Sequence, residues 1–93
     1  MSLHVVEMSA PAGKQQVTLT SDKPEHNLAI AELQSADARR MAIQHAGSRG
    51  ITNARCEMPS APYPVDPAGE PVADPIKQKI ASYRVDVPIS TGM

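Results

Sequence analysis

The sequence predicts an α+β fold, in which a small antiparallel β-sheet of about four to five strands packs against one main helix. Three observations lead to this prediction. Short alternating β-branched segments lie near both ends of the chain, and the middle holds one well-capped helical segment. Six prolines fall within residues 59–75, which predicts a Pro-rich extended crossover before the last strand. The 93 residues are expected to form a single small domain, residues 1–93, with 59–75 as an arm within it.

The first twenty residues predict a β-hairpin. Leu3–Met8 is apolar and partly β-branched, and Gln15–Thr20 alternates apolar and polar side chains. Between them, Pro11 fixes one backbone angle and Gly13 permits a left-handed conformation. Two short strands around such a loop are typical of a hairpin.

Two interpretations of the next segment remain open. In Asn27–Gln34, Leu28 and Ile30 alternate with alanines, which favours a strand. Alternatively, a single long helix could run from Asp22 to Ala46, because Asp22 and Glu25 have the spacing of a capping box. We expect the strand, since the apolar stripe of the long helix would include Asp37 and Gln44.

A helix is predicted after Ser35, a favourable N-cap, with Gly47 as its C-cap. Its buried face is expected to consist of alanines centred on Ala42. Gly50 should then turn the chain into a strand over Ile51–Met58. In that strand Ala54, Cys56 and Met58 are expected to point inward and Arg55 outward.

The C-terminal third is expected to be extended. Asp74 and Pro75 resemble an N-cap and first helical residue, which predicts a short helix to about Ala81. Alternation from Tyr83 to Ile89 predicts the last strand, and Pro88 predicts that this is an edge strand or the end of one. The arm is long enough for strand exchange between two subunits.

Composition predicts a small core. The chain has no Phe and no Trp, and Leu, Ile and Val account for 17 of the 93 residues. Aromatic side chains contribute much of the buried area in small domains, so we expect the monomer to be only marginally stable. We therefore expect the protein to form a homodimer. The single cysteine and the absence of a signal peptide or a long apolar run favour a cytoplasmic protein with no membrane association.

No catalytic, metal or cofactor motif is recognisable. The three histidines are scattered, and Cys56 has no base or orienting group in its segment. Gly47-Ser48-Arg49-Gly50 matches the GxxG loop of KH domains, but a helix end followed by a turn also explains both glycines. The sequence therefore predicts a protein that is not an enzyme and that uses no cofactor or metal.

The strongest candidate for function is a group of four arginines with no acidic residue between them, namely Arg39, Arg40, Arg49 and Arg55. They carry four positive charges in a chain whose net charge is −1. Arginine favours bidentate contact with carboxylate or phosphate groups. The alternative is that these residues only solvate an exposed surface, as most surface charges do. We take the four as the predicted interaction site.

The predicted strand, Ser-capped helix, glycine turn and strand over Asn27–Met58 resembles the core of several small phage-encoded proteins, including some anti-CRISPR inhibitors. This resemblance covers about thirty residues and implies a protein-binding regulator or inhibitor of a larger assembly. The arginine run departs from it, because such inhibitors usually present acidic surfaces. Two other functions are weighed beside it: weak nucleic-acid binding through the arginines, and a structural or virion subunit with an exchanged arm.

Overall fold

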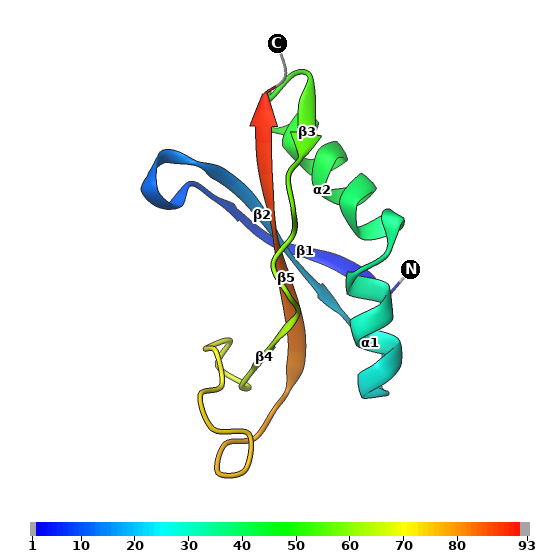
Figure 1. The fold of residues 1–93 in the computed structure, drawn as a ribbon, viewed down its shortest axis with the longest axis vertical. Helices are drawn as coiled ribbons and strands as arrows, with labels where there is room; N and C mark the ends of the chain where they lie inside the picture. Colours follow the sequence, from blue (N-terminus) through cyan, green and yellow to red (C-terminus); the bar gives the residue numbers. More distant parts are fainter. Residues whose placement is uncertain (1, 92–93) are drawn as a thin grey trace.

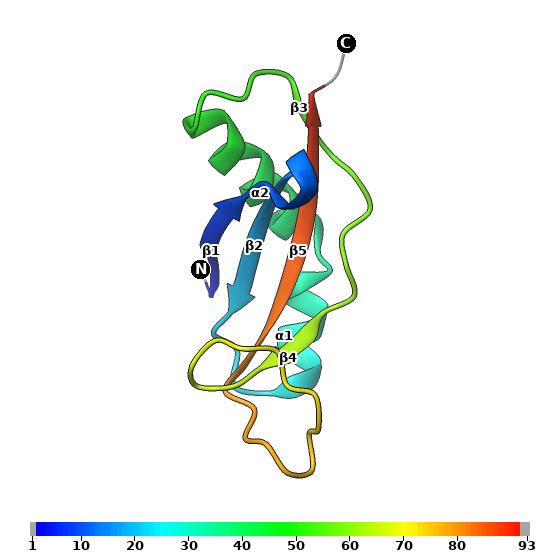
Figure 2. The same ribbon diagram turned by 90° about the vertical axis from the view of Figure 1, so that its left-hand side faces the viewer.

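The computed structural model describes residues 2–91 and shows an antiparallel sheet of five strands with two helices on one face (Figures 1 and 2). In sheet order the strands are β1, β2, β5 and β3, and β4 also pairs with β5. We call the face covered by the helices the helix face and the opposite face the open face. The elements are β1 Leu3–Ser9, β2 Gln15–Ser21, α1 His26–Leu33, α2 Ala36–Ser48, β3 Ala54–Cys56, β4 Tyr63–Val65 and β5 Ser82–Thr91. The α+β prediction is confirmed at this level.

The predicted N-terminal hairpin is present. β1 and β2 pair antiparallel around a 3-10 turn over Pro11–Gly13, in which Gly13 has a φ of 81°. A β-bulge interrupts the pairing between Val5 and Glu7. Val17 and Leu19 of β2 are completely buried on the helix face, as their alternation predicts.

The strand predicted over Asn27–Gln34 is wrong, because residues 27–33 belong to α1 and Gln34 is the C-cap of that helix. Ala29 and Leu33 are four residues apart, so in a helix they share one face, and both are buried. Leu28 is left 49% exposed. The alternation of apolar residues was therefore misleading, and the pair at helical spacing decided the local structure. The resemblance to phage-encoded proteins began with this strand, so that part of the resemblance does not hold.

The alternative of one long helix is also wrong, because the helix is interrupted at Gln34 and Ser35. Leu33 and Ala38 are five residues apart and would face about 140° away from each other on a continuous helix. The break changes the helix direction so that both are buried. The Ser35 hydroxyl accepts a hydrogen bond from the Ala38 N–H at 3.3 Å, as predicted for an N-cap.

The alanine face of α2 is confirmed, since Ala38, Ala42 and Ala46 have no exposed surface. Without longer side chains the helix axis can lie close to the sheet. The predicted C-cap at Gly47 is wrong. The helix continues through Ser48, and Gly50, with a φ of 90°, makes the turn that follows.

Pro88 does not mark an edge strand, because β5 is the centre of the sheet, with β2 on one side and β3 and β4 on the other. The Pro88 carbonyl accepts a hydrogen bond from the Glu57 N–H at 2.9 Å. Its nitrogen therefore faces the same side, in the gap between β3 and β4. A residue without an N–H fits there because no ladder hydrogen bond is needed from it.

The strand predicted over Ile51–Met58 is much shorter. Only β3 pairs in the sheet, and Asn53 just before it adopts a positive φ of 55°. Ala54 and Cys56 pack against the core as predicted, but Met58 is 85% exposed. The prolines that follow Met58 explain why regular pairing does not continue from β3, since after them only the three residues of β4 pair with the sheet.

The core lies between the sheet and the two helices. Its largest fully buried side chains are aliphatic and come from β2, β5 and α1: Leu19, Leu33, Val17, Val85 and Val87. Val65 of β4 is also fully buried, but it lies outside this core, on the face of the sheet that carries Tyr63. Both tyrosines are only partly buried. The molecule is elongated, with extents of 45 × 28 × 19 Å. No helix within residues 2–91 is long and apolar enough to cross a membrane.

Candidate functional site

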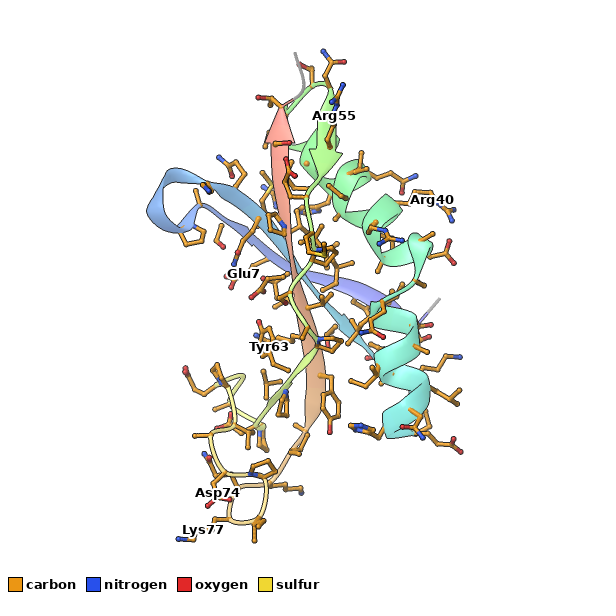
Figure 3. The ribbon with its side chains drawn as sticks, viewed as in Figure 1. Glu7, Arg40, Arg55, Tyr63, Asp74 and Lys77 are labelled. Atoms are coloured by element: carbon orange, nitrogen blue, oxygen red, sulfur yellow. The ribbon has the colours of Figure 1, made fainter. Side chains whose placement is uncertain are left out.

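The four arginines of the predicted interaction site are all exposed, and Figure 3 shows two of them, Arg40 on α2 and Arg55 on β3. Arg39, on α2, borders a hollow beside Pro59–Ala61, where the chain leaves β3. Arg49, just after α2, borders a hollow against the β1–β2 hairpin at the opposite side of the sheet. Arg40 pairs with Asp37 on its own helix, and Arg55 projects from β3. Arg39 and Arg49 therefore border different hollows, and the four arginines come from three segments of the chain.

Cys56 has the environment of a structural thiol. Its sulfur donates a hydrogen bond to the Arg39 carbonyl at 3.3 Å and links β3 to α2. Burial raises the pKa of the Cys56 thiol, and the charge of Arg39 only partly offsets this. Because the thiolate is the reactive form, a raised pKa makes a poor nucleophile.

The histidines lie apart and contact different partners. His4 pairs with Asp22 at 2.5 Å, and the His26 ring nitrogen lies 2.7 Å from the Tyr83 hydroxyl. His45 lies in the last turn of α2, where its Nε2 is buried and has no hydrogen-bond partner among the described residues. In the part of the chain that the structure describes, no group of three potential metal ligands comes together.

A polar cluster on the open face connects three strands. The Thr18 hydroxyl of β2 and the Tyr63 hydroxyl of β4 both donate to Asp86 Oδ1 of β5, at 2.7 and 3.0 Å. The Asp86 N–H donates to the Ser60 hydroxyl, which fills the gap between β3 and β4. Burial, followed by the hydrogen bond to Asp86 and the charge of that carboxylate, raises the pKa of Tyr63 to about 12. Sequence alternation predicts Asp86 on this face but not its partners.

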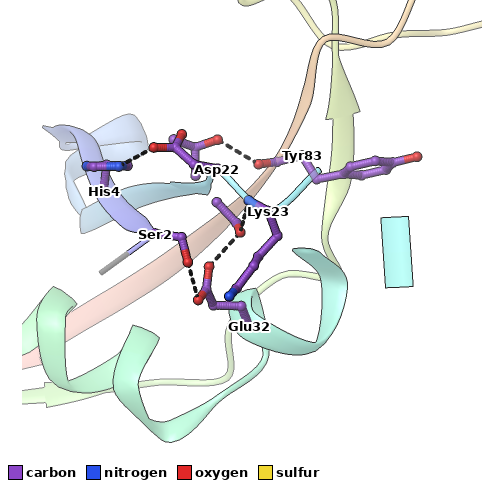
Figure 4. A network of polar contacts seen from close by, with 8 residues as sticks. Ser2, His4, Asp22, Lys23, Glu32 and Tyr83 are labelled. Atoms are coloured by element: carbon purple, nitrogen blue, oxygen red, sulfur yellow. Dashed lines mark hydrogen bonds and ion pairs between the residues drawn. The ribbon is translucent and has the colours of Figure 1, made fainter. Parts of the chain in front are cut away.

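A second polar network fastens the N-terminus to α1 (Figure 4). The Ser2 and Ser21 hydroxyls each donate to one oxygen of the Glu32 carboxylate at 2.6 Å. These two hydrogen bonds lower the pKa of Glu32. The network holds the start of β1, the end of β2 and the last turn of α1 together.

The loop between β4 and β5, residues 66–81, is built from two turns that its own side chains hold in place. In the first turn, Asp66 Oδ1 accepts hydrogen bonds from the N–H groups of Ala68 and Glu70, both at 2.9 Å. Gly69 has a φ of 85°, and its carbonyl lies 3.5 Å from the Arg84 guanidinium. The first turn therefore lies over β5.

The second turn replaces the short helix predicted from Asp74 to Ala81, which the structure does not contain. The Asp74 carboxylate accepts a hydrogen bond from the Ile76 N–H at 3.0 Å. The Gln78 side-chain oxygen accepts from the N–H groups of Ala73 and Asp74, both at 3.0 Å. Both ends of the turn are thus fixed by side-chain acceptors.

Ile76 is the tip of this second turn, and it is 95% exposed. Lys77 follows it directly, and Figure 3 shows Asp74 and Lys77 at the end of the molecule far from Arg55. Lys79 also lies nearby in the chain, so the tip combines one large apolar side chain with two cations. The sequence did not predict this site, because an isoleucine is typical of a core position and only the fold shows that Ile76 is exposed.

The two edges of the sheet differ in how they are protected. One edge consists of β3 and β4, which are three residues each and are separated by prolines. The other edge is β1, seven residues long, which among the described residues pairs only with β2. Proline and short strands discourage pairing with another chain, so β1 is the edge open to a further strand.

Comparison with known proteins identifies no relative that could extend these observations. No family model matches the chain, and neither curated proteins nor solved structures give a significant match.

Proposed function

We propose that this chain is a small non-enzymatic protein-binding module, a regulator or inhibitor of a larger assembly, that inserts Ile76 into an apolar pocket of a partner protein. The observation that carries the proposal is the exposure of Ile76 on a turn fixed by Asp74 and Gln78. Fixing the turn before binding reduces the entropy lost on association, which increases affinity without any additional contact.

The charges around the tip favour a partner whose binding pocket has acidic residues at its rim. Lys77 and Lys79 both follow the apolar side chain in the chain, and the Asp74 carboxylate accepts a hydrogen bond within the turn. A pocket with apolar walls and acidic residues at its rim would match this surface. Complete burial of an isoleucine side chain contributes about 1.5–3 kcal/mol, enough to make Ile76 the central contact of a small interface.

The rest of the fold positions the loop that carries Ile76. The Pro-rich segment 59–75 serves in this proposal as a stiff crossover that carries the loop beyond the end of the sheet. The contact between Gly69 and Arg84 anchors the base of the loop to the central strand. A rigid base with a projecting apolar tip is suited to occupying a pocket on a larger protein.

Site-specific photo-crosslinking tests this function in the cells in which the protein is made. A photoreactive residue at position 77 should give one dominant crosslinked protein. The additional substitution Ile76→Asp should abolish that product, whereas Met58→Asp, which alters another highly exposed apolar residue elsewhere, should not. The proposal fails if position 77 gives no specific product, or if both substitutions have the same effect.

A further inference from the structure

The hydrogen-bonding groups on the free edge of β1 can be assigned from its pairing with β2. The Asp22 N–H donates to the Ser2 carbonyl at 2.8 Å, so Ser2 directs its backbone groups toward β2. Because this direction alternates along a strand, Leu3 and Val5 direct theirs toward the free edge. The bulge after Val5 shifts the alternation by one residue, so Met8 joins them. These three residues are evenly spaced along the edge, with Val5 in the middle.

Apart from the bulge residue Val6, the side chains of β1 that pair with β2 are arranged symmetrically about Val5. Leu3 is buried in the core of the helix face, and Val5 and Met8 pack against that core. His4 and Glu7 are exposed and lie opposite Thr20 and Thr18 in the pairing with β2. From Val5 toward the N-terminus the strand has His4 and then Leu3. Toward the C-terminus the bulge adds Val6, which is 38% exposed, before Glu7 and Met8.

We propose that two copies of this chain associate by pairing β1 with β1 in an antiparallel manner, about a twofold axis at Val5. In this register Leu3 of one copy lies beside Met8 of the other, and His4 lies beside Glu7. A histidine next to a glutamate is a favourable cross-strand pair. A twofold axis at His4 or at Glu7 would instead place two histidines or two glutamates beside each other, whereas the axis at Val5 pairs two apolar side chains.

Three features of the fold agree with this arrangement. The bulge lies opposite His4 of the other copy. Leu3, Val5 and Met8 can therefore still form backbone hydrogen bonds with their partners in the other copy. Both helical layers fall on the same side of the joined sheet, because Leu3 and Met8 both belong to the helix face. The opposite edge, with its prolines and strands of three residues, does not offer a comparable surface. The pairing also extends a core that contains no fully buried aromatic residue.

Disulfide trapping tests the register directly. Residues in a hydrogen-bonded antiparallel pair lie about 5.5 Å apart between Cα atoms, which suits a disulfide. In a background with Cys56→Ser, the variant Val5→Cys should form a covalent dimer under mild oxidation. His4→Cys alone and Glu7→Cys alone should not, whereas a mixture of these two should crosslink. Equal crosslinking of all three single variants, or none with Val5→Cys, would overturn the proposed register.

A measurement without engineered cysteines provides the second test. In sedimentation equilibrium the wild-type protein should reach about twice its 9.9 kDa mass as concentration rises. Val5→Lys should remain folded by circular dichroism and stay near the monomer mass, because it places two cations at the axis. The Val5 amide should exchange with solvent more slowly as the wild-type concentration increases. A monomer at all concentrations, with an unprotected Val5 amide, excludes the dimer.

Discussion

The Asp74 carboxylate accepts a hydrogen bond from the Ile76 N–H at 3.0 Å, and so the residue that fixes the turn also orients the side chain at its tip. In a loop without this contact, the exposed isoleucine would lose conformational freedom on binding and the interface would be weaker. This hydrogen bond therefore both fixes the turn and holds the proposed contact residue in place before binding.

Asp74→Ala should therefore loosen the turn without unfolding the protein. The contact lies at an exposed end of the molecule, so the free energy of unfolding should fall by less than about 1 kcal/mol. Amide exchange should accelerate at residues 73–78 and remain unchanged in β2 and β5. Asp66→Ala is the matched control, since it removes the acceptor of the first turn. If exchange at residues 73–78 were as slow as in the wild type, Asp74 would not fix the tip.

The stability of the wild-type protein should fall in strong alkali because of Tyr63. Its pKa is about 12 in the folded protein, against 10 for an ordinary tyrosine. The unfolded chain therefore releases this proton first, and the contribution that is complete below pH 10 is lost as the pH rises toward 12. Urea midpoints measured between pH 9 and 12 should fall more steeply for the wild type than for Tyr63→Phe. Parallel curves would show that Tyr63 ionises without affecting the fold.

Protonation of Glu32 should lower the stability of the folded protein in acid. Its folded pKa lies below the ordinary value of 4.5, because the Ser2 and Ser21 hydroxyls donate to the ionised form. Its contribution is therefore present above pH 4.5 and is lost as the pH falls through the lower, folded value. Urea midpoints between pH 6 and 2 should drop less for Glu32→Gln than for the wild type. Identical drops would mean that the network does not stabilise the folded state.

Arg39 and Arg40 distinguish the loop tip from the site predicted by the arginine run, which stays a prediction. Because α2 lies away from the tip, Arg39→Ala with Arg40→Ala should leave both folding and partner binding unchanged. Weaker binding in the double variant would move the interface to α2. Oligonucleotide binding that weakens steeply between roughly 50 and 200 mM salt would favour the nucleic-acid alternative instead.

Local rules predicted the elements whose signals lie close together in the chain. The Pro11 and Gly13 turn gave the hairpin, and the Ser35 cap with its alanine face gave α2. α1 was missed because Leu28 and Ile30 alternate like strand residues, while burial selected Ala29 and Leu33. Only packing against the sheet could decide between these two patterns.

The candidate surfaces depended even more on contacts that are distant in sequence. Pro88 looked like an edge residue until its nitrogen was found in the gap between β3 and β4. The four arginines look adjacent in the chain, but Arg39 and Arg40 belong to α2, Arg49 follows that helix, and Arg55 lies on β3 beyond the turn at Gly50. Exposure of Ile76 is a property of the folded loop, and no sequence pattern distinguishes it from a buried isoleucine.

The most direct test of the central claim is the affinity of the crosslinked partner, once purified, for three forms of the protein. The account predicts that Ile76→Ala weakens binding by about 10- to 100-fold, as expected for the loss of most of a buried isoleucine side chain. Met58→Ala, which removes a similar apolar surface at the end of β3, should bind as tightly as the wild type. Equal affinity for all three forms would contradict the claim that Ile76 is the anchor of the interface.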